Sequence, residues 1–506
     1  MKLFVNCRAY AFDALSRTYT VQKALLVDGA RFGGFDESLA GVGVERIDLE
    51  GACVVPAFAD CHVHLTDTGY MAGARDLGRV RSAAEFEARI GALPRERFVV
   101  AGGYDESRWV DGASAGASPL DVHLPEAFAM CVRVDGHSCL VNRKTLAHLG
   151  LDAQLPGLER DAAGTPTGRL FLEANWLAQS RFFAQLPIAE RRAAERRAGE
   201  LALREGAVHL HAQLLGFDGR DAYAAEIDAL RSLPGLKIYP KICERDPALA
   251  RSFGLPYIGG DVFLDGSIGS GTAAVTTPYC SAPFGDGATP IGRLALDDAD
   301  VAAYFSQAER LGVSAGVHAI GDRAIEQCLA TWEQVLDGKA SPRNRHFIEH
   351  FEIATREQIA RCARLGIYLS MQPQFDADWG GDGGMYEARL GPQRMRAMNA
   401  LGSAVRAGAT VCGGDDSPVC RLSPLAGMAA ACAHHTASER LAPLQALTMY
   451  TYDAARLGHA ESHAGVLAPG YDADFVVLDR DAPSDGSFAE ARVAQTWANG
   501  ERVYPA

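Results

Sequence analysis

The chain has 506 residues, of which 48% are hydrophobic and 22% are charged, as in an ordinary globular protein. This length exceeds one simple core and predicts two or three domains, although α/β barrels often exceed about 250 residues as one unit. The formal net charge of −14 argues against nucleic acid or an anionic membrane as the main partner, because both favour a basic surface. A small-molecule substrate is therefore the expected partner, and assembly into a homo-oligomer is left open.

The 12 cysteines are scattered singly along the chain, without any Cys-x-x-Cys pair. This pattern favours reduced, buried thiols over a disulfide framework. The first residues, Met1 to Cys7, lack the apolar segment of a signal peptide, and no apolar run approaches the length of a membrane span. We therefore expect a cytoplasmic protein.

Short strand-like segments occur at both ends of the chain. In residues 1–55 they are separated by glycines, and similar segments return in residues 465–506. We expect these two ends to assemble into one small β domain.

Residues 56–464 alternate strand-like and helical stretches, the pattern of repeated βα units and a parallel sheet. An opening strand at 53–64 is followed by seven further expected strands, at 207–211, 236–240, 262–265, 313–318, 346–350, 366–370 and 409–416. Between the first two lies a long insert, residues 66–190, which is expected to lie over the mouth of a barrel. The predicted fold class is α/β, with the site on the rim formed by the C-terminal strand ends.

The opening strand ends in the sequence Asp60-Cys61-His62-Val63-His64. Alternate side chains of a strand share a face, so His62 and His64 are expected to project together. Two neighbouring imidazoles can form half of a metal site.

Matching residues recur at the ends of later strands. His318 ends the fifth expected strand, His350 the sixth and Asp416 the eighth, so these side chains converge with His62 and His64 if the strands close a barrel. Imidazoles with a carboxylate suit zinc or a related first-row divalent ion. Such an ion lowers the pKa of a water from about 16 towards about 7, and a neighbouring carboxylate can pass its proton to a leaving amine. Asp416 is the candidate for this carboxylate, with Asp415 as its rival.

With these motifs the chain resembles the amidohydrolase superfamily of metal-dependent hydrolases, and within it the branch related to N-substituted formamide deformylases. The matching stretches run through nearly the whole chain: 56–64, 134–137, 264–270, 318–324, 348–350, 414–419 and 465–477. The resemblance implies a distorted (β/α)8 TIM-like barrel at 56–464, a β-sandwich built from 1–55 and 465–506, and metal ligands at His62, His64, His318, His350 and Asp416.

The chain departs from this branch at Asp261. A lysine commonly stands four residues before the Asp-Gly-Ser segment, where its carboxylated form can bridge two metal ions, and Asp261 occupies that place here. Asp261 is thus a candidate bridging ligand with a shorter side chain, and Lys237 and Lys241 are weaker substitutes. We expect one ion, most simply zinc, rather than two.

Two further histidines are candidate catalytic residues. His137 lies in the insert, where it can either contact a substrate carbonyl or stabilise its own loop. His211 belongs to a second His-x-His pair with His209 and is expected to act behind the metal ligands, by hydrogen bonding or polarising a ligand.

The sequence therefore predicts hydrolysis of a non-peptide carbon–nitrogen bond in an amide-like small molecule, with Asp416 as general base and acid. A deaminase or a lactone hydrolase is the alternative that uses the same residues. A non-catalytic binding relative is a further alternative, which the presence of five ligand-type residues disfavours.

Overall fold

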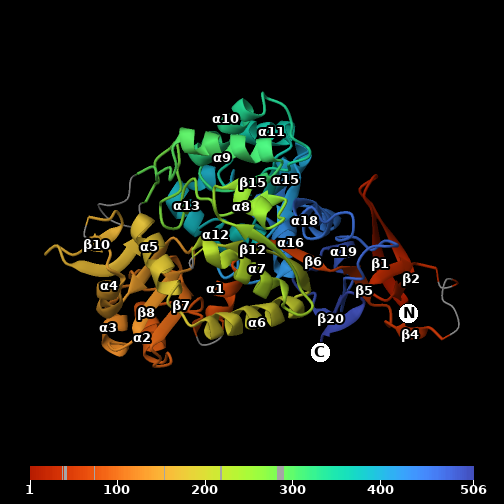
Figure 1. Ribbon diagram of the computed structural model, residues 1–506, viewed down its shortest axis with the longest axis horizontal. Coiled ribbons are helices and arrows are strands. Elements are labelled where there is room, and N and C mark those ends of the chain that lie inside the picture. The colour runs from red at the N-terminus through yellow and green to blue at the C-terminus, as the bar shows by residue number, and fades with distance from the viewer. Residues whose placement is uncertain are drawn as a thin grey trace.

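The computed structural model describes residues 1–36, 38, 43–72, 75–152, 154–216, 219–281 and 290–505. In Figure 1 the strands of both chain ends lie together at one end of the molecule, the helix-covered parallel strands lie at its centre, and the insert lies at the opposite end. No helix among these residues is both long and apolar enough to cross a membrane.

Strands from both ends of the chain form one eight-stranded sheet in the order β21-β20-β19-β5-β1-β2-β3, with β4 paired to β1. Its strands are β1 (Lys2–Asp13), β2 (Thr18–Asp28), β3 (Arg31–Gly34), β4 (Glu45–Asp48), β5 (Cys53–Pro56), β19 (Phe475–Leu478), β20 (Val493–Ala498) and β21 (Glu501–Tyr504). The rings of Phe4, Phe475 and Trp497 meet in its core, with centroids 5.0–5.4 Å apart. The strand pairing shows a single sheet, so the two-sheet sandwich and its limits at 1–55 and 465–506 stay predictions.

The expected opening strand at 53–64 is wrong as one element, because it is divided between two sheets. β5 pairs with β19 of the terminal sheet, whereas β6 (Phe58–Val63) pairs with β12 of the central region. Ala57 lies between them and donates its backbone N–H to Asp474 in the terminal domain. The chain therefore passes from the terminal sheet into the strand that carries His62 within a few residues.

The central region contains eight parallel strands within the described residues, arranged as a three-stranded sheet, β13-β12-β6, and a five-stranded sheet, β14-β15-β16-β17-β18. After β6, they are β12 (Ala207–Leu214), β13 (Lys237–Ile242), β14 (Tyr257–Ile258), β15 (Ser314–Ala319), β16 (Phe347–His350), β17 (Tyr368–Met371) and β18 (Val411–Gly413). Helices separate them: α6 (Ile188–Arg204), α7 (Tyr223–Arg231), α8 (Pro247–Ser252), α9 (Asp298–Leu311), α10 (Asp322–Val335), α11 (Arg356–Leu365), α12 (Pro373–Trp379), α13 (Met385–Leu390), α14 (Pro392–Met395) and α15 (Leu401–Arg406). After β18 follow α16 (Pro424–Ala433), α17 (Pro443–Met449), α18 (Tyr452–Leu457) and α19 (Ala482–Asp485). The α/β class with alternating strands and helices is confirmed.

Backbone hydrogen bonds connect the two parallel sheets at both edges. Gly259 donates to Ile242 at 2.9 Å, joining the end of β14 to β13. On the other side, Asp416 donates to His62 at 2.8 Å and His64 donates to Ser417 at 2.9 Å. These bonds hold the C-terminal end of β6 beside the segment that follows β18.

The fourth strand was predicted at 262–265, and this is wrong: β14 covers only Tyr257–Ile258. Gly259 and Gly260 follow with φ of 86° and 107°, and a Cβ on either would lie within 2.2 Å of a neighbouring oxygen. Residues without a Cβ adopt this backbone and allow this approach, so the strand ends there. Asp261 comes directly after this turn, and Phe263 then makes an isolated bridge to His318.

The insert carries a five-stranded sheet of its own, in the order β10-β11-β9-β8-β7. Its strands are β7 (Phe98–Tyr104), β8 (Phe128–Arg133), β9 (Ser138–Val141), β10 (Leu158–Arg160) and β11 (Pro166–Phe171), and its helices are α1 (Leu65–Tyr70), α2 (Ala83–Gly91), α3 (Ser118–His123), α4 (Arg143–Leu149) and α5 (Leu172–Phe183). The loop between β8 and β9 holds Asp135 and His137, and it faces the C-terminal ends of the parallel strands.

Candidate metal centre

Four histidines and two aspartates meet where the parallel strands end. His62 lies at the end of β6 and His64 directly follows it, His318 lies in β15, and His350 is the last residue of β16. His350 and Asp416 have φ of 73° and 53°, in the left-handed region that residues other than glycine seldom adopt. Such strained positions cluster at functional sites, where the surrounding structure holds them.

Asp416 lies between the first two histidines. Its Oδ1 is 3.2 Å from His62 Nε2 and 3.1 Å from His64 Nε2. These three side chains present one ligand atom each within a span of 4.8 Å, which is the size of a metal site.

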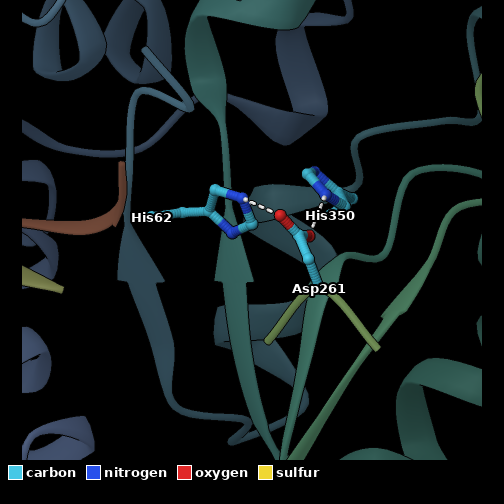
Figure 2. A group of neighbouring side chains, drawn as sticks. All are labelled: His62, Asp261 and His350. Atoms are coloured by element: carbon cyan, nitrogen blue, oxygen red, sulfur yellow. Dashed lines mark ion pairs between the residues drawn. The ribbon is translucent and has the colours of Figure 1, made fainter. Parts of the chain in front are cut away.

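Asp261 contacts all four imidazoles (Figure 2 shows two of these contacts). Its Oδ2 lies 3.4 Å from His62 Nε2 and 3.2 Å from His64 Nε2, while its Oδ1 lies 3.7 Å from His318 Nδ1 and 3.9 Å from His350 Nε2. The two oxygens of one carboxylate thus face two different pairs of histidines. The side chain is shorter than that of a lysine, yet it reaches both pairs from its position directly after the Gly259-Gly260 turn.

Several polar atoms that face one another in this cluster lie within ion-pair distance but form no hydrogen bond. His62 Nε2, His318 Nδ1, Asp261 Oδ1 and Asp416 Oδ1 are buried and make no hydrogen bond within the described residues. Buried polar atoms are normally satisfied, so a group of them that converges on one point indicates a missing ligand. Their chemistry, imidazole nitrogen and carboxylate oxygen, fits a divalent metal ion.

The electrostatics of the cluster also favour a cation. Burial lowers the pKa of His62, but the carboxylates of Asp261, Glu349 and Asp416 outweigh it and raise this pKa well above its ordinary value. Burial likewise raises the pKa of Asp261, yet His62, His318 and His350 bring it well below its usual range. Because these carboxylates favour a positive charge at a buried imidazole, a bound metal ion could supply that charge in place of a proton.

Asp415, the rival of Asp416, points away from the cluster. Its carboxylate accepts hydrogen bonds from Gln374 Nε2 at 2.9 Å, Tyr450 Oη at 3.2 Å and Ser423 N at 2.6 Å. Burial raises its pKa to about 7. Asp415 therefore anchors the loop after β18, and Asp416 is the aspartate that faces the histidines.

Glu349 and Lys241 support the cluster from inside the parallel strands. Glu349 Oε2 lies 2.9 Å from His62 Nδ1, and Lys241 Nζ donates to Glu349 Oε1 at 2.6 Å and to Cys61 O at 2.9 Å. Lys241 and His62 lower the pKa of Glu349 to about 2 against the effect of its burial. A carboxylate on the second nitrogen of a ligand histidine fixes its ring and tautomer.

Sequence reasoning missed the role of Glu349. The signal available was an acidic residue next to His350 within an otherwise apolar strand. Lys241 and Lys237 were weak candidates for the bridging position, and the structure places both elsewhere: Lys241 on Glu349, and Lys237 on Asp474 at 2.8 Å.

His137 lies beside the cluster. Its ring centroid is 5.3 Å from that of His318, and it packs edge-on against Trp176 and Phe263. Burial, and then the charge of His318, lower the pKa of His137 to about 3. A neutral imidazole at this place can donate one hydrogen bond and accept another.

His211 lies deeper between the strands and is not among the residues that line the cavity above the cluster. Its ring stacks on Tyr239 at 4.9 Å, and neither ring nitrogen has a hydrogen-bond partner within the described residues. Burial, and then the charge of Lys241, lower its pKa well below the ordinary value. The structure does not bring His211 into contact with the other candidate residues, and its expected role stays a prediction.

A cavity opens above the six candidate ligands. The insert contributes Arg133, Asp135 and Trp176 to its wall, and the barrel region contributes Phe263 and Val419. The wall thus combines aromatic and apolar side chains with a few charged ones, as in small-molecule sites.

Comparisons with known proteins show the family to which the chain belongs. The profile of the amidohydrolase family matches residues 45–504, so the chain belongs to the amidohydrolase family. It is 27% identical over 498 residues to the amidohydrolase-type protein YtcJ of Bacillus subtilis (strain 168), covering 91% of this chain and 90% of that protein. It is 25% identical over 550 residues to the N-substituted formamide deformylase of Arthrobacter pascens, covering 99% and 98%. A solved structure, an uncharacterized metal-dependent hydrolase of Pyrococcus furiosus, is similar with a TM-score of 0.73 at 25% identity, covering 95% of this chain and 99% of that one.

The family resemblance predicted from the motifs is thereby confirmed. The chain is a hydrolase of the amidohydrolase family, and it carries histidine and aspartate groups that could hold a metal ion.

Proposed function

We propose that this protein hydrolyses a non-peptide carbon–nitrogen bond in an amide-like small molecule. The observation that carries the proposal is the convergence of four imidazoles on the carboxylates of Asp261 and Asp416 beneath a covered cavity. The name of the Arthrobacter relative, a deformylase of N-substituted formamides, supports this bond class. We also propose that the two parallel sheets act as one distorted (β/α)8 barrel, since hydrogen bonds already connect them at both edges.

The ligand set would be His62, His64, His318, His350, Asp261 and Asp416, which suits zinc. When bound, such an ion supplies Lewis-acid polarisation and a lowered pKa for the attacking water. Asp416 would take a proton from that water and return it to the departing nitrogen. His137 is neutral and lies beside His318, so it is the better placed of the two candidate histidines to donate a hydrogen bond to the substrate carbonyl.

The contacts of Asp261 bear on the number of ions. One ion was expected because Asp261 replaces a bridging lysine, but its Oδ2 faces His62 and His64 while its Oδ1 faces His318 and His350. We therefore propose that the cluster would hold two ions, one on the side of His62 and His64 and one on the side of His318 and His350. Elemental analysis of protein purified in excess zinc should give about two ions per chain in place of one, and a ratio near one would restore the single-ion interpretation.

Product analysis tests the reaction class. The metal-loaded protein is incubated with simple N-alkyl amides, amino-substituted heterocycles and lactones. We expect a carboxylic acid and a free amine from the amides. Ammonia from the heterocycles would identify a deaminase, and a hydroxy acid without amine would identify a lactone hydrolase. An empty metal site with no turnover would favour a non-catalytic relative.

A further inference from the structure

A second cavity opens directly on the candidate ligands. It shares His318, His350 and Asp416 with the first cavity, and it extends from them towards α12 and α13. A molecule whose scissile bond lies at the metal cluster can therefore place one of its substituents here.

The walls of this second cavity are mostly apolar. Ile268, Ile320, Phe375, Trp379 and Met385 line it, together with the ring of Tyr386. The ring of Phe375 lies parallel to that of His350, with an interplanar angle of 8° and centroids 6.0 Å apart. The apolar surface thus begins beside a candidate ligand.

The polar atoms of aromatic residues in this cavity already have partners. Trp379 Nε1 donates to Asp105 Oδ2 at 2.8 Å, and Tyr386 Oη donates to Glu352 Oε2 at 2.8 Å. A ligand group here therefore meets aromatic faces more than free donors.

The charged side chains on the insert side are paired in the same way. The buried guanidinium of Arg133 contacts Asp135 at 2.9 Å, Glu106 at 2.8 Å and Asp105 at 3.2 Å. Asp135 Oδ2 in turn accepts from the hydroxyls of Ser267 and Ser270 at 2.7 and 2.6 Å. Because three carboxylates already pair with its guanidinium, Arg133 is expected to bind an anionic substrate poorly.

From these observations we infer that the second cavity is a specificity subsite for a compact, uncharged apolar substituent of the substrate, such as a saturated or aromatic ring. This inference rests on the proposed amide hydrolysis. Burial of an apolar group there is favourable because it removes hydrocarbon surface from water. An anionic group would lose its hydration and would face the ionised carboxylate of Asp416.

Substrate pairs test the subsite. N-(cyclohexylmethyl)acetamide, with the ring on the amine side, is compared with N-methylacetamide. 2-Cyclohexylacetamide, with the ring on the acyl side, is compared with acetamide. The ratio of kcat/KM within at least one pair should favour the ring by about 10-fold or more, because each buried apolar group adds discrimination of this order. A ratio near one in both pairs, or a preference for N-carboxymethylacetamide, would overturn the inference.

Substitutions of Met385, which is half-buried on α13, test the apolar character of the subsite. Met385→Asp should lower that selectivity ratio about 10-fold or more, since a carboxylate then stands in the apolar wall. Met385→Leu, which keeps the volume and polarity, should change it less than about threefold. If Met385→Asp does not fold, Met385→Gln serves the same purpose with an uncharged polar group.

A binding measurement separates this subsite from the proposed reaction. Calorimetry with cyclohexylmethanol, which has no amide bond, should show binding to the metal-loaded wild type and to Met385→Leu, and binding at least about 10-fold weaker to Met385→Asp. If no amide is hydrolysed but this pattern holds, the proposed function fails and the subsite stands. If amides are hydrolysed but Met385→Asp binds cyclohexylmethanol as well as the wild type, the subsite is overturned.

Discussion

Replacing both His62 and His64 by alanine is expected to remove the ion on their side of the cluster and to reduce turnover to the uncatalysed background. Each imidazole contacts both Asp261 and Asp416, so the double variant deletes the nitrogens on one side of the cluster. Without the ion, the water that attacks has its ordinary pKa of about 16, and little hydroxide is available near neutral pH. Metal content by elemental analysis and turnover of an amide substrate measure the two effects.

The double variant should still fold. Glu349 keeps its buried ion pair with Lys241 at 2.6 Å, and Asp261 keeps its contacts with His318 and His350. Asp416 loses both of its imidazole contacts and is expected to bind a proton instead. The circular dichroism spectrum should therefore match that of the wild type. Activity that persists in metal-free double variant would contradict the proposed site.

The second His-x-His pair offers a matched control for metal content. His209 and His211 have the same spacing on a neighbouring strand, but His209 pairs with Asp474 at 3.2 Å and His211 stacks on Tyr239. Replacing these two by alanine should leave the metal content per folded chain unchanged. Comparing the two double variants therefore shows whether metal binding depends on His62 and His64 in particular or on any His-x-His pair in this region.

Strand periodicity, together with the family resemblance, predicted which distant side chains converge. His62, His64, His318, His350 and Asp416 were selected because they end strands of a parallel α/β region, and such ends share one rim. The structure brings them within a few ångströms of Asp261 or of one another, whereas their roles as ligands stay a proposal. The pattern worked here because it depends on local alternation and on the direction of the strands.

Features that depend on pairs of distant residues were not predictable. Glu349 and Lys241 meet across strands 108 positions apart, and a single sequence gives no sign of which buried charge pairs with which. The reach of Asp261 depends on the path of the Gly259-Gly260 turn, which side-chain length does not reveal. The apolar subsite is formed from helices after β17 and from the loop after β14, where the composition resembles that of any core.

Asp416→Asn is expected to lower kcat by about 10²- to 10⁴-fold, the usual contribution of a positioned proton-transfer group. Asparagine keeps the size of the side chain and can still accept a hydrogen bond, but it cannot take a proton from water. Because Asp416 Oδ1 also faces His62 and His64, the metal content of the variant has to be measured together with kcat. Asp415→Asn is the neighbouring control: it should weaken stability by roughly 1–3 kcal/mol through disturbed buried hydrogen bonds and lower kcat much less.

Two substrates with different leaving groups show whether Asp416 transfers a proton or only binds the metal. An anilide releases a weakly basic amine that needs little protonation, whereas an N-alkyl amide releases a strongly basic one. If Asp416 returns the proton to nitrogen, the loss in kcat for Asp416→Asn should be clearly smaller with the anilide than with the alkyl amide. Equal losses for both substrates, with the metal retained, would leave Asp416 as a ligand and assign the proton transfer to another group near the cluster.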